Sequence, residues 1–194
     1  MSKYNVINIL DLAQGIGEDA LSSVLSDFSC AKNCEIEDFV KRNALEFAKK
    51  KLSVTYLAVD DELNVMAIFT LAHKALEIKN NGLSKTTMRK LGRFASLDED
   101  SNAYTVSAFL IAQFGKNDAE NTDISISGNE LMDASFAVLS QIQHDIGGAI
   151  VYLECEEKQK LLDFYCKEPN CFTRFGERYS KKDDTKYIQL FKFL

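Results

Sequence analysis

Hydrophobic positions along the chain follow two periods, one typical of helices and one typical of strands. Apolar residues that recur about every 3.6 residues indicate amphipathic helices. Short runs rich in β-branched and aromatic residues, alternating or continuous, indicate strands. The first pattern predicts helices over 18–28, 36–50, 85–94, 131–146 and 156–167. The second predicts strands over 4–10, 53–59, 65–72 (with an extension to 78 left open), 108–112, 149–154, 171–175 and 187–193.

Strands and helices alternate in this order, which predicts a mixed α/β (α+β) sheet with helices on both faces. The chain has 194 residues with one proline and nine glycines, so no linker is visible and we predict a single domain over 1–194. The start, MSKYNVINIL, lacks the pattern of a signal peptide, and no apolar run reaches the ~20 residues of a membrane helix. We therefore expect a cytoplasmic protein with no membrane partner.

The cysteines and histidines are not spaced as in a disulfide framework or a metal site. The five cysteines are an odd number and contain no C-x-x-C pair, which favours reduced thiols. Neither His73 nor His144 has a second ligand at metal-binding spacing. No metal site is expected.

Charge is unevenly distributed. The net charge of −6 and the pI near 5.0 argue against a general nucleic-acid-binding protein. Residues 74–93 nevertheless hold six basic side chains against one acidic one, a local net charge of +5. This segment is either a solvated helix face or a patch that attracts phosphate or an acidic partner.

The stretch Ala108–Leu139 leads from an apolar strand through a polar loop into a helix. A helix N-terminus with unpaired N–H groups is suited to bind phosphate. Ser127 and Glu130 have the spacing of a capping box, which many helices use without any ligand. Both interpretations stay open from these residues alone.

Three features resemble the GCN5-related N-acetyltransferase (GNAT) superfamily. They are the strand Phe109–Gly115 leading to Ser127 and Gly128, the strand Ile150–Glu154 followed by a helix with Leu161–Tyr165, and the pair Cys171–Phe172. The resemblance implies a central, mostly antiparallel twisted sheet with a splayed pair of central strands. It also implies acetyl-CoA as co-substrate.

In such a fold the pantetheine arm pairs with the first splayed strand, and the pyrophosphate lies at the N-terminus of the next helix. By resemblance the cofactor-binding residues are Phe114, Gly115, Lys116, Ser125, Ile126, Ser127, Gly128 and Asn129. The family loop is usually Q/R-x-x-G-x-G/A. Asp123 and Ile126 occupy its first two defined positions here, and only Gly128 fits.

Tyr165 resembles the family's general acid, which protonates the departing CoA thiolate; a phenol with a pKa of ~10 is protonated at neutral pH. Its structural alternative is packing on the sheet. Glu154 is the leading candidate for the base that deprotonates the amine, with Glu156 and Glu157 as competitors. These acids are equally consistent with a solvated strand end and a helix start.

The resemblance thus implies an N-acetyltransferase that transfers acetyl from acetyl-CoA to an amine by direct attack. Two alternatives remain: a GNAT-fold binding or regulatory module without catalysis, and a toxin-like acetyltransferase acting on aminoacyl-tRNA. The expected partners are acetyl-CoA and an amine acceptor. Nucleic acid is expected only in the form of tRNA, and the assembly as a monomer or homodimer.

Overall fold

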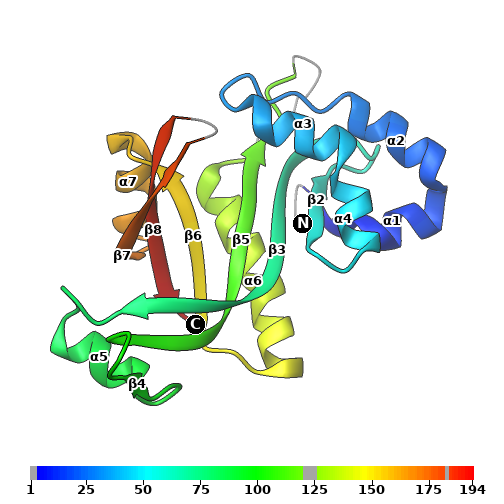
Figure 1. The fold of residues 1–194 in the computed structure, drawn as a ribbon. Coiled ribbons are helices and arrows are strands. Elements are labelled where there is room, and N and C mark those ends of the chain that lie inside the picture. The colour runs from blue at the N-terminus through cyan, green and yellow to red at the C-terminus, as the bar shows by residue number, and fades with distance from the viewer. Residues whose placement is uncertain (1–3, 120–125, 182–183) are drawn as a thin grey trace. The chain divides into compact units, whose positions relative to one another are not determined.

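A computed structural model of the chain describes residues 4–119, 126–181 and 184–194. Within these residues eight strands form one sheet in the order β1-β2-β3-β5-β6-β8-β7, with β4 paired to β5 (Figure 1). Strands β5 and β6 are parallel, whereas β1–β2, β2–β3, β4–β5, β6–β8 and β7–β8 are antiparallel. The predicted mixed, mostly antiparallel sheet is confirmed.

The strands are β1 Asn5–Asn8, β2 Val54–Val59, β3 Val65–Lys79, β4 Leu97–Asp98, β5 Ala103–Lys116, β6 Ile150–Glu156, β7 Thr173–Ser180 and β8 Thr185–Phe193. The helices are α1 Ile9–Ile16, α2 Glu18–Ser26, α3 Cys34–Arg42, α4 Ala44–Lys49, α5 Lys85–Leu91, α6 Gly128–Ile146 and α7 Gln159–Cys166.

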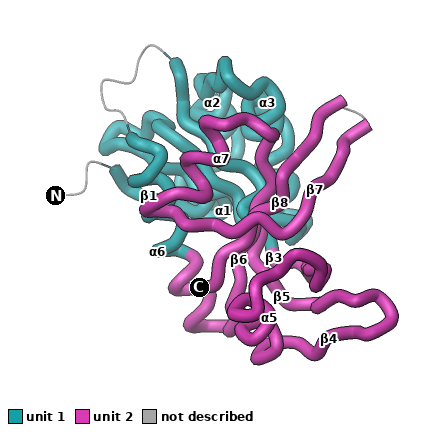
Figure 2. The backbone as a smooth tube through the Cα atoms, turned by 90° about the vertical axis from the view of Figure 1, so that its left-hand side faces the viewer, with its two compact units in different colours: residues 1–72, 111–138 teal, residues 73–110, 139–194 magenta. Residues whose placement is uncertain are grey.

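The chain divides into two compact units, coloured separately in Figure 2. Unit 1 comprises residues 1–72 and 111–138, and unit 2 comprises residues 73–110 and 139–194. Strands β3 and β5 and helix α6 each contribute residues to both units.

Unit 1 has its own core, in which helices α1 to α4 pack beside β2 and the first part of β3. Phe28, Leu21 and Leu57 are fully buried within it, and Ala48 of α4 is buried as well. Thr55 and Thr70 are buried on neighbouring strands, and their hydroxyls share a hydrogen bond of 2.8 Å. The two hydroxyls thereby give each other a hydrogen-bond partner inside the apolar sheet.

Unit 2 has a second core, formed by alternate residues of β3, β5 and β6 together with Leu91 of α5. Leu76 and Ile78 of β3 are buried there, while the residues between and beside them are exposed. This is the period-two pattern of a strand with one covered face. The short helix α5 therefore covers the sheet with one side and leaves its other side in solvent.

Two predictions near the N-terminus, one of a strand and one of a helix, are wrong in detail. The predicted strand 4–10 ends at Asn8, whose side chain accepts the Leu10 N–H at 2.9 Å and begins α1. The predicted helix 36–50 is two helices separated at Asn43, where φ is −119°. The Asn8 side chain offers the backbone a local alternative to a continuous strand. Asn43 makes no side-chain cap hydrogen bond, so α3 and α4 are separated there by the backbone alone.

Strand lengths also differ from the sequence prediction. Strand β5 begins at Ala103, five residues before the predicted start at Ala108. The prediction is too short because the exposed Thr105 and Ser107 interrupt the apolar run, although they alternate with buried residues as in a strand with one covered face. The sequence pattern predicts no strand over Arg178–Lys186, but β7 extends to Ser180 and β8 begins at Thr185. The predicted helix end at Gly147 and Gly148 is confirmed, with φ of 76° and 112°.

Candidate functional site

The end of β5 lies in unit 1 and carries three of the predicted cofactor-binding residues. Phe114 is half-buried and Lys116 is exposed. Gly115 is buried against α3, and a Cβ atom at this position would lie 3.1 Å from Ile36 Cγ2. Close packing of β5 on α3 therefore explains this glycine without a ligand.

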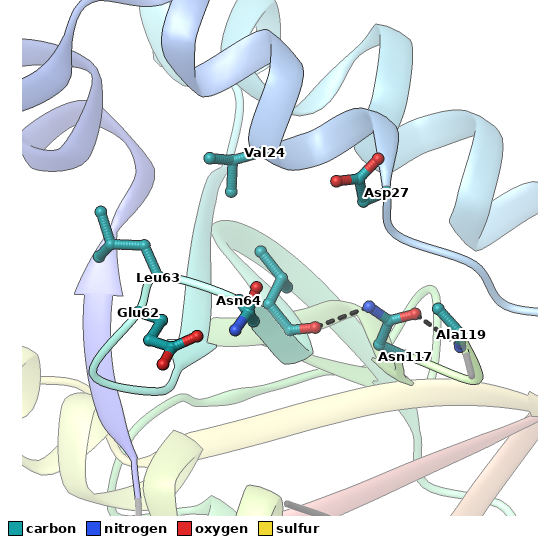
Figure 3. A pocket seen from close by; sticks show the side chains of 8 residues that line it. Val24, Asp27, Glu62, Leu63, Asn64, Asn117 and Ala119 are labelled. Atoms are coloured by element: carbon teal, nitrogen blue, oxygen red, sulfur yellow. Dashed lines mark hydrogen bonds between the residues drawn. The ribbon is translucent and has the colours of Figure 1, made fainter. Parts of the chain in front are cut away.

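Asn117 connects the end of β5 to the rest of unit 1 (Figure 3). Its Nδ2 donates to the Val65 carbonyl at 2.7 Å, and its Oδ1 accepts from the N–H groups of Ser29 at 2.9 Å and Ala119 at 3.0 Å. Its backbone N–H donates to the Met66 carbonyl at 2.8 Å. One side chain thus fixes the backbone at the end of β5 against Val65 and Ser29.

A cavity of about 340 Å³ lies beside this network in unit 1. Its lining residues are Val24, Asp27, Glu62, Leu63, Asn64, Val65, Asn117 and Ala119. Asp27 and Glu62 give the lining a negative charge, which disfavours a phosphate ligand. The cavity does not therefore replace the α6 N-terminus as the candidate pyrophosphate site.

Helix α6 begins with the predicted capping box. The Ser127 N–H donates to Glu130 Oε2 at 2.7 Å, and the Glu130 N–H donates to Ser127 Oγ at 3.1 Å. Ile126 is only 2% exposed, so its side chain belongs to the core. Gly128 and Asn129 form the first helical residues, whereas Ser125 lies outside the described residues. An anion at this end would compete with the Glu130 carboxylate for the Ser127 amide.

Tyr165 lies on α7 in unit 2 and is 8% exposed. Its ring makes edge contacts with Phe164 and Phe172, at centroid distances of 4.9 and 6.1 Å. Burial, followed by the electrostatic effect of Cys155, raises the pKa of the Tyr165 phenol well above its ordinary value. The phenol therefore stays protonated across the physiological pH range.

Cys155 follows Glu154 on β6 and is buried. Burial raises the pKa of its thiol to about 11, and Cys166 and Glu156 add to the effect. Because only a thiolate is an effective nucleophile, Cys155 is unsuited to carry an acyl group.

Glu154, the predicted base, is held by two neighbours in unit 2. Arg178 donates to its Oε2 from Nε at 2.9 Å and from Nη2 at 2.6 Å, and Gln189 donates to its Oε1 at 2.8 Å. Its side chain is 22% exposed. Both carboxylate oxygens thus have a fixed orientation, and one of them faces a guanidinium.

The competing acids are also ion-paired. Glu156 pairs with Lys158, and Glu157 lies 3.3 Å from Lys186 and 3.7 Å from Arg174. The ion pairs therefore do not single out one of the three acids. The predicted cofactor-binding residues belong to unit 1, and Tyr165 and Glu154 belong to unit 2.

Within the described residues, no helix is both long and apolar enough to cross a membrane. Among those residues, no group of three or more histidine, cysteine, aspartate or glutamate side chains is placed to hold a metal ion.

Solved structures with a similar fold include KacT, the AtaT toxin and the NatC complex. A tyrosine-to-phenylalanine mutant of KacT is 14% identical, with a TM-score of 0.67, and the match covers 99% of this chain and 95% of that one. AtaT complexed with acetyl-methionyl-tRNAfMet is 12% identical, with a TM-score of 0.62 and coverage of 95% and 93%. AtaTR bound with AcCoA is 14% identical, with a TM-score of 0.59 and coverage of 100% and 94%.

No protein-family model and no curated protein matches the sequence. The structural similarity at these low identities spans nearly the whole chain. The chain has the fold of the GCN5-related N-acetyltransferases.

Proposed function

We propose that this chain is an N-acetyltransferase that transfers the acetyl group of acetyl-CoA to an amine by direct attack. The observation that carries the proposal is the buried, protonated Tyr165 on the helix that follows β6, in a chain with the GNAT fold. AtaTR was solved with AcCoA, and the NatC complex with CoA and a Gag peptide, in structures of the same fold. We further propose a cytoplasmic, single-domain protein that acts as a monomer or homodimer.

The proposed reaction needs one acid and one base. The amine nitrogen attacks the thioester carbonyl carbon, the carbon–sulfur bond breaks, and the sulfur leaves with the bonding electron pair. The Tyr165 hydroxyl gives its proton to that sulfur, and the base takes the proton that the amine loses. A phenol with a raised pKa is fully protonated when the sulfur departs, and a thiolate in a dry site is a strong proton acceptor.

The cofactor is assigned to the residues of unit 1 that the resemblance identifies. The arm would lie along Phe114–Lys116, and the pyrophosphate would lie at the first turn of α6, near Gly128 and Asn129. The helix dipole supports an anion there. The Glu130 carboxylate opposes it, because it already accepts the Ser127 N–H.

Glu154 is proposed as the base, oriented by Arg178 and Gln189. We expect Glu154→Gln to lower kcat about a hundred-fold, because an amide keeps the shape but accepts no proton. Acetyl-CoA affinity should change little. Steady-state kinetics gives kcat, and isothermal titration with acetyl-CoA gives the affinity.

Arg178→Gln is the matched control for this variant, since it breaks the same ion pair and leaves the carboxylate in place. It should lose clearly less activity than Glu154→Gln, because Gln189 still holds the carboxylate. Equal losses of activity in the two variants would mean that the Glu154–Arg178 ion pair has a structural role only. Full activity of Glu154→Gln would mean that another group is the base.

A second function has one observation in its favour. The capping box at α6 engages a carboxylate where the cofactor pyrophosphate is expected, as in a fold that has lost catalysis and serves as a binding or regulatory module. Isothermal titration with acetyl-CoA separates the two. Binding followed by thiol release with an amine acceptor is expected. No binding at millimolar acetyl-CoA would contradict the enzyme, and binding without turnover across small amines, peptides and aminoacyl-tRNA would favour the module.

A further inference from the structure

Helix α5 and the residues after it form a basic surface of unit 2. We call Lys85, Arg89, Lys90, Arg93 and Phe94 the α5 patch. All four cations are exposed, and residues 85–93 contain no acid in a chain of net charge −6. Lys85, Arg89 and Arg93 recur every four residues, so they share one side of the helical turn. The Arg93 N–H donates to the Lys90 carbonyl at 3.1 Å, which continues that turn past Leu91.

The cations of the α5 patch have no carboxylate partner within the part of the chain that the structure describes. Arg89 and Lys90 lie in the last turn of α5, where the helix dipole favours positive charge. Lys85 is the first residue of the same helix, where the dipole disfavours it. Helix stability therefore explains part of the patch and leaves Lys85 unexplained.

An exposed aromatic side chain accompanies the cations. Phe94 is 54% exposed, and its ring lies 6.4 Å from the ring of Phe193. The Lys90 ammonium lies 5.2 Å from the centre of the Phe193 ring. Cations combined with an exposed aromatic face are typical of surfaces that bind single-stranded nucleic acid, where phosphates meet the cations and bases stack on the ring.

The basic patch does not extend from α5 onto the neighbouring segments of the chain. Lys74 and Lys79 are five residues apart on β3 and therefore point to opposite faces of the sheet, so the basic segment is not one continuous surface. The acids nearest in sequence after α5 are Asp98, which ends β4, and those of the turn that follows it. There Asp98 Oδ1 accepts the N–H groups of Asp100 at 2.9 Å and Ser101 at 3.2 Å.

We propose that the α5 patch binds the phosphate backbone of RNA, and that the acceptor amine of this protein is carried on RNA, as in an aminoacyl-tRNA. The second clause rests on the proposed function. The charge supports RNA over other acceptors, since small amines and protein N-termini are cationic and are repelled by an unpaired basic surface. The patch thus serves the anionic part of an acceptor whose amine reacts elsewhere.

Fluorescence anisotropy with unacylated tRNA tests the binding without any chemistry, from about 50 to 200 mM salt. The double variant Lys85→Gln/Arg89→Gln should bind about ten-fold more weakly, and the slope of log affinity against log salt should fall by about two. The control Lys50→Gln/Lys181→Gln removes two exposed cations outside the patch. It should leave affinity and slope unchanged.

Phe94→Leu provides a second variant with a different signature. Loss of stacking should weaken binding several-fold at every salt concentration with the slope unchanged. Absence of tRNA binding at about 50 mM salt, equal losses in the patch variant and the control, or binding of an acidic protein in place of RNA would each overturn the proposal.

Acetyl-CoA titrations on the same variants separate this proposal from the proposed function. Unchanged acetyl-CoA affinity is expected in Lys85→Gln/Arg89→Gln. A wild-type protein that binds acetyl-CoA but no tRNA would refute the RNA surface alone. One that binds tRNA but no acetyl-CoA would refute the acetyltransferase and leave the RNA surface standing.

Discussion

Tyr165→Phe is expected to lower kcat by about two to three orders of magnitude, with acetyl-CoA affinity changed less than about two-fold. The substitution removes the only proton that the side chain can give. It keeps the ring in its contacts with Phe164 and Phe172. Thiol release measured at saturating acetyl-CoA, with isothermal titration for the affinity, checks both parts.

Tyr179→Phe is the matched control in the same unit. Tyr179 is 57% exposed on β7 and hydrogen-bonds to Asp184. It should keep full activity. If Tyr165→Phe also keeps full activity while the protein turns over acetyl-CoA, Tyr165 is a packing residue and another group protonates the thiolate.

Gly128→Glu is expected to weaken acetyl-CoA binding about a hundred-fold. A carboxylate about 5 Å from a phosphate repels it by about 3 kcal/mol at an effective dielectric constant near 20. The fold should be unharmed, because glutamate has a higher helix propensity than glycine and its charge complements the dipole at a helix start. Titration calorimetry gives the affinity, and thermal unfolding without ligand should show an equal or higher midpoint.

Gly128→Gln separates charge from size, since it adds the same bulk without the charge. It should lose clearly less affinity than the glutamate variant. Equal losses would assign the effect to bulk, and undiminished affinity in Gly128→Glu would mean that the pyrophosphate binds away from the α6 N-terminus.

Much of the fold could be read from local patterns. Buried strands such as β6 and amphipathic helices such as α6 have a strong period, and glycines end α6 where φ is positive. The errors occur where two weak signals compete. Asn8 and Asn43 interrupt elements that apolar spacing alone extends, and the alternation in Ala103–Ser107 includes polar residues on an exposed face.

The candidate site divides in the same way. The Phe164–Tyr165 pair and the Ser127–Glu130 capping box are local patterns, so the sequence could place them on their helices. The Asn117 network was missed, because it joins residues 88 positions apart and an asparagine after a strand is ordinary turn chemistry. The pairing of Glu154 with Arg178 was missed for a similar reason, since the two residues are 24 positions apart and the sequence pattern predicts no strand at Arg178.

By itself the sequence determined most of the order of strands and helices, the resemblance to the GNAT superfamily, and the identity of Tyr165 as a candidate acid, because each depends on residues close together in the chain. Only the tertiary structure decided that Tyr165 is buried with a raised pKa, that Glu154 is held by Arg178 and Gln189, and that the α5 cations have no carboxylate partner among the described residues. Burial and ion pairing depend on segments that are distant in sequence and meet only when the sheet forms, and a residue pattern does not encode those contacts locally.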